Sequence, residues 1–83
     1  MSYQVQLLST AVQQIERLNS QVQQQVMKKL EELASNPIPE GAINLSVGEN
    51  LYLVVINEYR IVYHIQEQDL LITVTKVAHS QDY

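Results

Sequence analysis

The sequence has no cysteine, tryptophan or phenylalanine, and it has only two glycines and two prolines. Without cysteine, neither a disulfide framework nor a thiolate zinc site can hold the chain together. Five tyrosines supply all of the aromatic surface that a core can use. Hydrophobic residues make up 46% of the 83-residue chain. This content is enough for one small globular domain over residues 1–83, and it argues against disorder.

Basic residues are also scarce, because five Lys and Arg side chains stand against nine Asp and Glu, for a formal net charge of -4. Nucleic-acid-binding surfaces normally carry an excess of Lys and Arg, so this balance disfavours a broad nucleic-acid interface. The N-terminus lacks a basic segment followed by an apolar run, and no segment approaches membrane-spanning length. The sequence therefore predicts a cytoplasmic protein that has no membrane partner.

Hydrophobic periodicity predicts one strand and two helices in the first half of the chain. Apolar residues at 3, 5 and 7 alternate with glutamines at 4 and 6, the pattern of a strand with one covered face, so residues 3–8 are predicted to be the first strand. Thr10 with Gln13, and Ser20 with Gln23, have the spacing of capping boxes, so two helices are expected. Each helix carries an apolar stripe that needs a flat surface to cover. The stripes are Val12, Ile15 and Leu18 in the first helix and Val22, Val26, Leu30 and Leu33 in the second.

The second half is predicted to be β-structure. Asn36 and Pro37 end the second helix, because proline disfavours the helical conformation in the residue before it. Segments rich in Val, Ile, Leu, Tyr and Thr then predict strands at residues 43–47, 51–56, 59–65 and 70–77. Their short connections predict hairpins, with Asn57 at a turn position of positive φ. The expected fold is α+β, in the order β-α-α-β-β-β-β, with the helical hairpin on one face of a twisted, mostly antiparallel sheet.

One arginine, Arg60, interrupts the apolar strand 59–65. A cation among apolar neighbours needs an ion-pair partner, a solvent-facing position or a functional role. Strict alternation places Arg60 on the same face as Val62 and His64. Two interpretations remain open: Arg60 binds a phosphate or carboxylate of a ligand, or it stacks on a tyrosine and pairs with an acidic residue of the protein. The acidic candidates are Glu49, Glu58 and Asp82.

The neighbouring strand 51–56 is apolar on both of its faces. The helical hairpin can cover only one face of the sheet, so something else must cover the other. An apolar second face is better suited to another protein, or to a second copy of this chain in a homodimer, than to a polar RNA groove.

Three segments share their order and spacing with the motifs of one known family. They are LEELASNP at residues 30–37, YRIVY at residues 59–63 and KVAHSQDY at residues 76–83. In these segments the chain resembles the RelE/ParE superfamily of toxins from type II toxin–antitoxin systems, also described as plasmid-stabilisation proteins. The resemblance covers essentially the whole chain and implies the same α+β fold.

The resemblance implies a partner and a target. The partner is a cognate antitoxin protein, and the target is either mRNA on the ribosome, which the mRNA interferase members cleave, or DNA gyrase, which the ParE branch inhibits. It implies neither a metal nor a cofactor. His79 and Asp82 alone are too few ligands for a metal site.

The resemblance also implies candidate catalytic residues. Arg60 matches the arginine of the motif YR, His79 matches the histidine of the motif HR, and Tyr83 matches the terminal tyrosine or falls one place short of it. His64, on the expected face of Arg60, completes the candidate set. Two departures weaken it: strand 51–56 has no Lys or Arg, and a serine follows His79 where the motif has arginine. Metal-free RNA cleavage needs such cations to hold the scissile phosphate.

Three functions from different classes remain open at this point. The first is a toxin that is catalytically weak or that acts by binding gyrase or another protein. The second is a ribonuclease that uses Arg60, His64, His79 and Tyr83 in an altered arrangement. The third is a decayed, non-toxic homologue that serves as a protein-interaction module.

Overall fold

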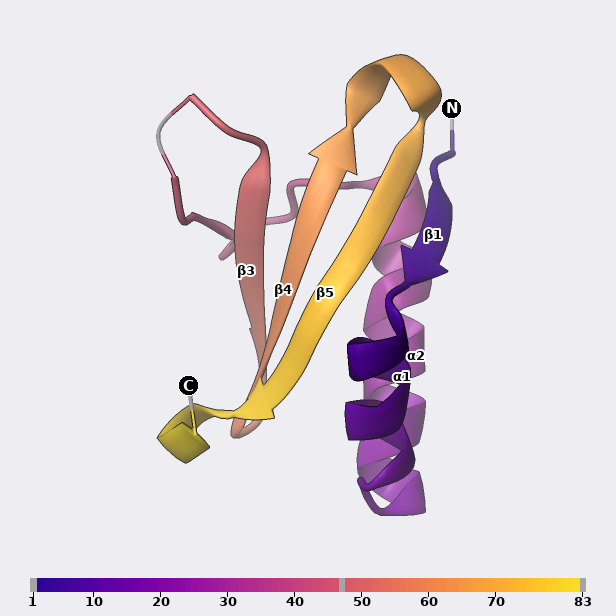
Figure 1. Cartoon of the computed structure of the whole chain (residues 1–83), viewed down its shortest axis with the longest axis vertical. Helices are drawn as coiled ribbons and strands as arrows, with labels where there is room; N and C mark the ends of the chain where they lie inside the picture. The colour runs from indigo at the N-terminus through magenta and orange to yellow at the C-terminus, as the bar shows by residue number, and fades with distance from the viewer. Residues whose placement is uncertain (1, 47, 83) are drawn as a thin grey trace.

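The computed structural model describes residues 2–46 and 48–82, which form a helical hairpin packed on a five-stranded sheet (Figure 1). The predicted α+β class and the order of the elements are confirmed. Two short 3-10 turns, η1 (Glu67–Asp69) and η2 (Ser80–Asp82), follow the last two strands. The main elements are β1 (Gln4–Leu7), α1 (Ser9–Glu16), α2 (Ser20–Ser35), β2 (Ile43–Asn44), β3 (Leu51–Ile56), β4 (Tyr59–Gln66) and β5 (Leu71–His79).

The strand order in the sheet is β1-β5-β4-β3-β2, so the first and the last strand of the chain lie side by side. That pair is parallel, whereas β5, β4, β3 and β2 are joined by antiparallel pairing, as the short connections predict. No helix within residues 2–46 and 48–82 is long and apolar enough to cross a membrane.

The hydrophobic core lies between the two helices and one face of the sheet. The stripe predicted for α2 is confirmed, because Val26, Leu30 and Leu33 are buried and Val22 packs against them. The stripe predicted for the first helix is wrong at two positions. Val12 is 37% exposed, and Ala11 takes the buried place. Leu18 packs against the core but lies beyond Glu16, where α1 ends. The sheet contributes Val54, Ile61, Tyr63, Ile65, Ile72, Val74 and Val77 to the core.

The first helix does not begin as predicted. Leu8 occupies the N-cap position of α1, and no side chain caps the helix. Thr10, expected to be the cap, lies inside the helix, and its hydroxyl donates a hydrogen bond to the Thr75 carbonyl at 3.3 Å. Thr10 therefore ties α1 to β5 rather than starting the helix.

The second helix begins one residue earlier than expected. Asn19 is the N-cap of α2, and its side-chain oxygen accepts a hydrogen bond from the Val22 N–H at 2.9 Å. Ser20 is the first helical residue. Gln23, expected to complete the capping box, instead donates to the Ile15 carbonyl at 2.9 Å and so joins the two helices.

The strands differ from the prediction mainly in length. The segment 43–47 contributes only Ile43–Asn44, while the last strand continues to His79. Asn57 has a φ of 53°, and a positive value is expected there. Leu70 also has a positive φ, of 49°, which the sequence does not predict. The pairing of β4 with β5 shifts between Val62 and Tyr63, which leaves Thr75 as the extra residue of a β-bulge.

Tyr63 anchors the loop that follows α2. Its side chain is fully buried, its ring stacks on Tyr52 with the centroids 6.0 Å apart, and its hydroxyl donates a hydrogen bond to the Pro37 carbonyl at 2.6 Å. Burial, with a smaller contribution from Tyr52, raises the pKa of the Tyr63 hydroxyl to about 12.

Candidate functional site

Arg60 lies on the face of the sheet that the helices do not cover. Its register partners are Val55 in β3 and Ala78 in β5, and its own side chain is half-buried. The alternation expected in β4 is confirmed, because Ile61 and Tyr63 are buried in the core on the opposite face.

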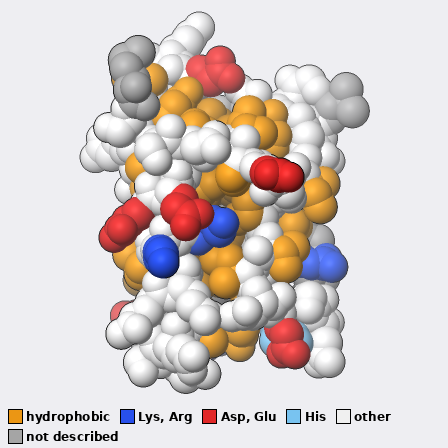
Figure 2. Space-filling view, turned by 180° about the vertical axis from the view of Figure 1, so that it is seen from behind, with side chains coloured by type: hydrophobic (Ala, Val, Ile, Leu, Met, Phe, Trp, Pro, Cys, Tyr) orange, Lys and Arg blue, Asp and Glu red, His pale blue; other side chains and the backbone are white. Residues whose placement is uncertain are grey.

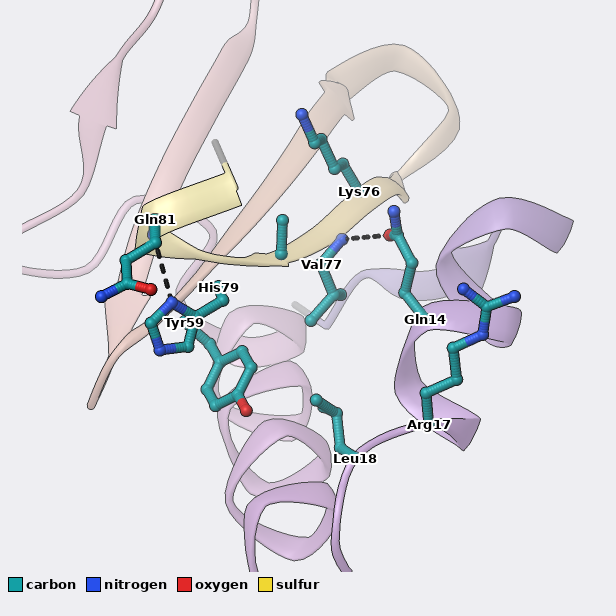
Figure 3. A pocket seen from close by; sticks show the side chains of 9 residues that line it. Gln14, Arg17, Leu18, Tyr59, Lys76, Val77, His79 and Gln81 are labelled. Atoms are coloured by element: carbon teal, nitrogen blue, oxygen red, sulfur yellow. Dashed lines mark hydrogen bonds between the residues drawn. The ribbon is translucent and has the colours of Figure 1, made fainter.

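His79, at the end of β5, contacts three neighbouring residues, two of which, Tyr59 and Gln81, are drawn in Figure 3. Its Nε2 lies 3.1 Å from a carboxylate oxygen of Glu58, and its ring meets Tyr59 edge-on with the centroids 5.2 Å apart. Its Nδ1 accepts a hydrogen bond from the Gln81 N–H at 3.1 Å. A ring nitrogen that accepts carries no proton, so the proton of this imidazole is on Nε2 and faces Glu58.

His64 is half-buried on the same face of β4 as Arg60, opposite Leu51 and Thr73. It borders a shallow hollow of about 430 Å³ that also contains Glu67 and Asp69. Carboxylates beside His64 disfavour a bound phosphate, because like charges repel.

The structure does not bring Arg60, His64 and His79 together. His79 pairs with Tyr59 and therefore faces the helices, whereas Arg60 pairs with Ala78 and faces away from them. His64 is on the same face as Arg60 but four residues along the strand, which is about 13 Å in an extended chain. Tyr83 lies outside the described residues.

The neighbouring strand β3 contributes no basic side chain to the surroundings of Arg60. Lys28 is exposed on α2, and Lys29 on the same helix lies 3.1 Å from Glu32. Both lysines thus lie on the solvated side of α2, away from the core. Among the side chains that the structure describes, no three from His, Asp or Glu are grouped as a metal site requires.

A cleft of about 560 Å³ lies between α1, the end of β5 and η2 (Figure 3). Sequence reasoning finds His79 but misses the α1 wall, because Gln14 and Arg17 are ordinary polar residues of a helix and carry no motif. The Gln14 side-chain oxygen accepts a hydrogen bond from the Val77 N–H at 2.7 Å. The cleft is lined by Gln14, Arg17, Leu18, Tyr59, Lys76, Val77, Ala78, His79 and Gln81.

Solved structures with the same fold come from bacteria and an archaeon. A chain of the intact E. coli RelBE toxin–antitoxin complex is 25% identical, with a TM-score of 0.82 over 94% of this chain and 96% of that chain. A RelBE toxin–antitoxin complex from Mycobacterium tuberculosis gives 18% identity and a TM-score of 0.83 over 95% of this chain and 99% of that chain. The RelE–RelB complex from Pyrococcus horikoshii gives 19% identity and a TM-score of 0.83 over 95% of this chain and 96% of that chain.

Sequence comparison identifies the family. No curated protein has a significantly similar sequence. A family model described as the ParE toxin of the type II toxin–antitoxin system, parDE, matches residues 5–83. The matched region includes both helices and all of the strands, apart from Gln4, which is the first residue of β1. The chain therefore belongs to the ParE toxin family of type II toxin–antitoxin systems.

Proposed function

We propose that this chain arrests growth by binding a protein target such as DNA gyrase, and that a cognate antitoxin holds it inactive. The observation that carries this proposal is the separation of Arg60 from His79 on opposite faces of the sheet. A binding toxin needs a complementary surface, whereas a ribonuclease needs its acid, base and phosphate-binding cations around one phosphate.

The energetics of phosphate binding support a binding mode of action. Each missing cation removes about 2–4 kcal/mol of transition-state stabilisation, which slows the chemical step by orders of magnitude. β3 has no cation, and Ser80 follows His79 where the ribonuclease motif has arginine. Arg60 then serves as a clamp for a carboxylate of the target.

Apolar surface supports a protein partner. Val55 and Ile43 are each 52% exposed, and both project from the sheet face that carries Arg60. Figure 2 shows that hydrophobic side chains also reach the surface on the side seen from behind, with acidic and basic side chains among them. The solved relatives named above are toxin–antitoxin complexes, which supports an antitoxin as one such partner. A homodimer would cover the same kind of surface.

The test is tightly controlled expression of the wild-type chain, Arg60→Ala and Lys28→Ala in bacteria, with growth, mRNA integrity and gyrase–DNA cleavage complexes measured together. We expect the wild type and Lys28→Ala to arrest growth with intact mRNA and accumulated gyrase complexes. Lys28 is the matched control because it is an exposed cation on α2. We expect Arg60→Ala to be folded and harmless.

Two outcomes would contradict the proposal. Ribosome-dependent mRNA cleavage by the purified wild type would assign the chain to the ribonuclease class. Normal growth with soluble, folded wild-type protein would instead identify a non-toxic homologue that acts as an interaction module.

A further inference from the structure

Lys76 lies on the same face of the sheet as Arg60. Its register partner is Val62, and the partner of Arg60 is Ala78, so the two basic residues are diagonal neighbours on adjacent strands. Val77, between Lys76 and Ala78, is buried in the helix-covered core, which places the side chains of its two neighbours on the opposite face. Figure 3 shows the Lys76 side chain leaving β5 on the side away from the Val77 side chain. The Lys76 ammonium therefore belongs to the uncovered face, although the residue also borders the cleft beside α1.

The spacing of the two basic residues suits a shared anion. Diagonal neighbours on paired strands are about 7–8 Å apart, which long side chains can bridge. Two of the five basic side chains of the chain are thus placed beside each other, in a protein of net charge -4. Like charges at this spacing repel each other, and one anionic group that lies between them replaces the repulsion with two attractions.

The surface around the two basic residues is apolar. Val62 is 7% exposed and its β3 partner Leu53 is 4% exposed, although both lie on the face that α1 and α2 do not cover. Arg60 and Lys76 are half-buried, and the stems of such side chains cover apolar neighbours while the charged ends stay at the surface. Val55, opposite Arg60, is 52% exposed. A ligand that covers this surface excludes water, which strengthens the attraction between opposite charges.

We propose that Arg60 and Lys76 together clamp one carboxylate of the target protein, with Lys76 as the second binding residue of the site. The inference rests on the proposed function, because it takes the target to be a protein. The planar guanidinium of Arg60 pairs with both carboxylate oxygens, and the Lys76 ammonium adds a point charge. The matching feature of the target is one acidic side chain between apolar ones, which pack on Val55 and Val62.

A single carboxylate suits this surface better than a nucleic acid does. A nucleic acid presents phosphates at regular intervals and needs cations along its whole path. The residues that β3 presents to this face are Leu51, Leu53 and Val55, which are all apolar. Two cations beside such a strand match one isolated anionic group and apolar neighbours on either side of it.

The direct test is an NMR titration of the isotope-labelled full chain with a blocked tripeptide of one glutamate between two valines. We expect chemical-shift changes in the side-chain signals of Arg60 and Lys76. Lys76→Gln keeps most of the aliphatic stem and removes the charge, so it should weaken binding about tenfold. Lys76→Arg keeps the charge and should bind nearly as well as the wild type. Lys28→Gln makes the same charge change on α2 and should leave the affinity unchanged.

A control peptide and two competing ligands make the titration decisive. The same tripeptide with glutamine in place of glutamate should not bind. Equal binding by the glutamine peptide, an unchanged affinity of Lys76→Gln, or no binding by the wild type would each overturn the proposal. Tighter binding of inorganic phosphate or of a single-stranded oligonucleotide at Arg60 and Lys76 would also overturn it. Thermal melting should show that Lys76→Gln remains folded; if it does not, the shift changes of the wild type and the affinity of Lys76→Arg decide.

Growth assays separate this inference from the proposed function. In the expression experiment described above, we expect Lys76→Gln to arrest growth less than the wild type does and to accumulate fewer gyrase complexes. Equal arrest by folded Lys76→Gln and by the wild type would overturn the role of Lys76 and leave the proposed function standing. A wild type that does not arrest growth would contradict the proposed function, and the tripeptide titration would still decide whether the two cations hold a carboxylate.

Discussion

At the scale of single residues, Tyr63 combines a buried aromatic ring with a polar hydroxyl that needs a hydrogen-bond partner. It is fully buried in the core, yet its hydroxyl reaches the Pro37 carbonyl at the start of the loop after α2. Tyr63→Phe keeps the ring and removes this hydrogen bond, so we expect a loss of about 1–2 kcal/mol in the free energy of unfolding at neutral pH. Urea denaturation of the two proteins measures the difference. Tyr59→Phe, on the half-buried end of the same strand, is the control and should lose less.

The raised pKa of Tyr63 makes this contribution depend on pH. An acid whose pKa is higher in the folded than in the unfolded state stabilises the fold below its unfolded pKa, and this stability is lost as the pH rises through the folded value. For Tyr63 the window runs from the ordinary value of 10.0 to about 12. We expect the stability difference between wild type and Tyr63→Phe to shrink across this window. A difference that stays constant in urea titrations at alkaline pH would contradict the assignment.

The candidate residues could be found in the sequence one at a time, but their arrangement could not. The alternation of β4 correctly separates Arg60 from Ile61 and Tyr63. The partner of each residue depends on the register with β5, and the bulge at Thr75 changes that register midway along the strand. A motif that names Arg60 and His79 together therefore does not say that they face opposite sides.

At the scale of elements, the start of α2 offers a sharp test. Asn19 caps the helix through the Val22 N–H, whereas Ser20, the cap that the capping-box pattern favours, is already helical. We expect Asn19→Ala to lower the free energy of unfolding by about 1 kcal/mol. Ser20→Ala should stay within about 0.5 kcal/mol of the wild type, because an exposed helical serine makes no cap. Chemical denaturation of both variants distinguishes the two assignments, and equal losses would contradict this one.

Elements were predictable where the apolar pattern was strong and uncertain where it was weak. The buried stripe of α2 follows from three large apolar residues at helical spacing. In α1 the buried position belongs to Ala11, whose small side chain gives little hydrophobic signal beside Val12. β2 pairs over only Ile43–Asn44, because its length is set by contact with β3 and not by its own composition.

At the scale of the whole molecule, the helices cover one face of the sheet. Two adjacent valines of β3, one on each face, test this arrangement. Val54 is 4% exposed in the helix-covered core, whereas Val55 is 52% exposed on the opposite face. We expect Val54→Ala to destabilise the protein by about 2 kcal/mol through lost burial and a residual cavity. Val55→Ala should cost less than about 0.5 kcal/mol in the isolated chain. Thermal or urea unfolding gives both values, and similar losses would contradict a core on one face.

A further variant at the exposed position, Val55→Asp, connects stability with partner binding. If a protein partner covers the face of Val55, then Val55→Asp should weaken that complex while leaving the isolated fold intact, because a charge in an apolar interface loses its hydration. Pull-down with a candidate antitoxin, read against the unfolding curve of the same variant, separates the two effects. Weak binding together with a lowered unfolding temperature would point to misfolding instead.

The parallel pairing of β1 with β5 governs when this protein can finish folding. β1 precedes the other strands of the sheet in the chain, and it has no neighbour until β5 has been made, because β5 lies between β1 and β4. The pairing must also close a loop that contains nearly all of the chain, and long-range closure of this kind slows folding. A nascent chain that stops before β5 consequently holds the helical hairpin without the strand on which α1 and β1 dock. The protein therefore completes its sheet, and gains any activity that the complete sheet carries, only after β5 has been made.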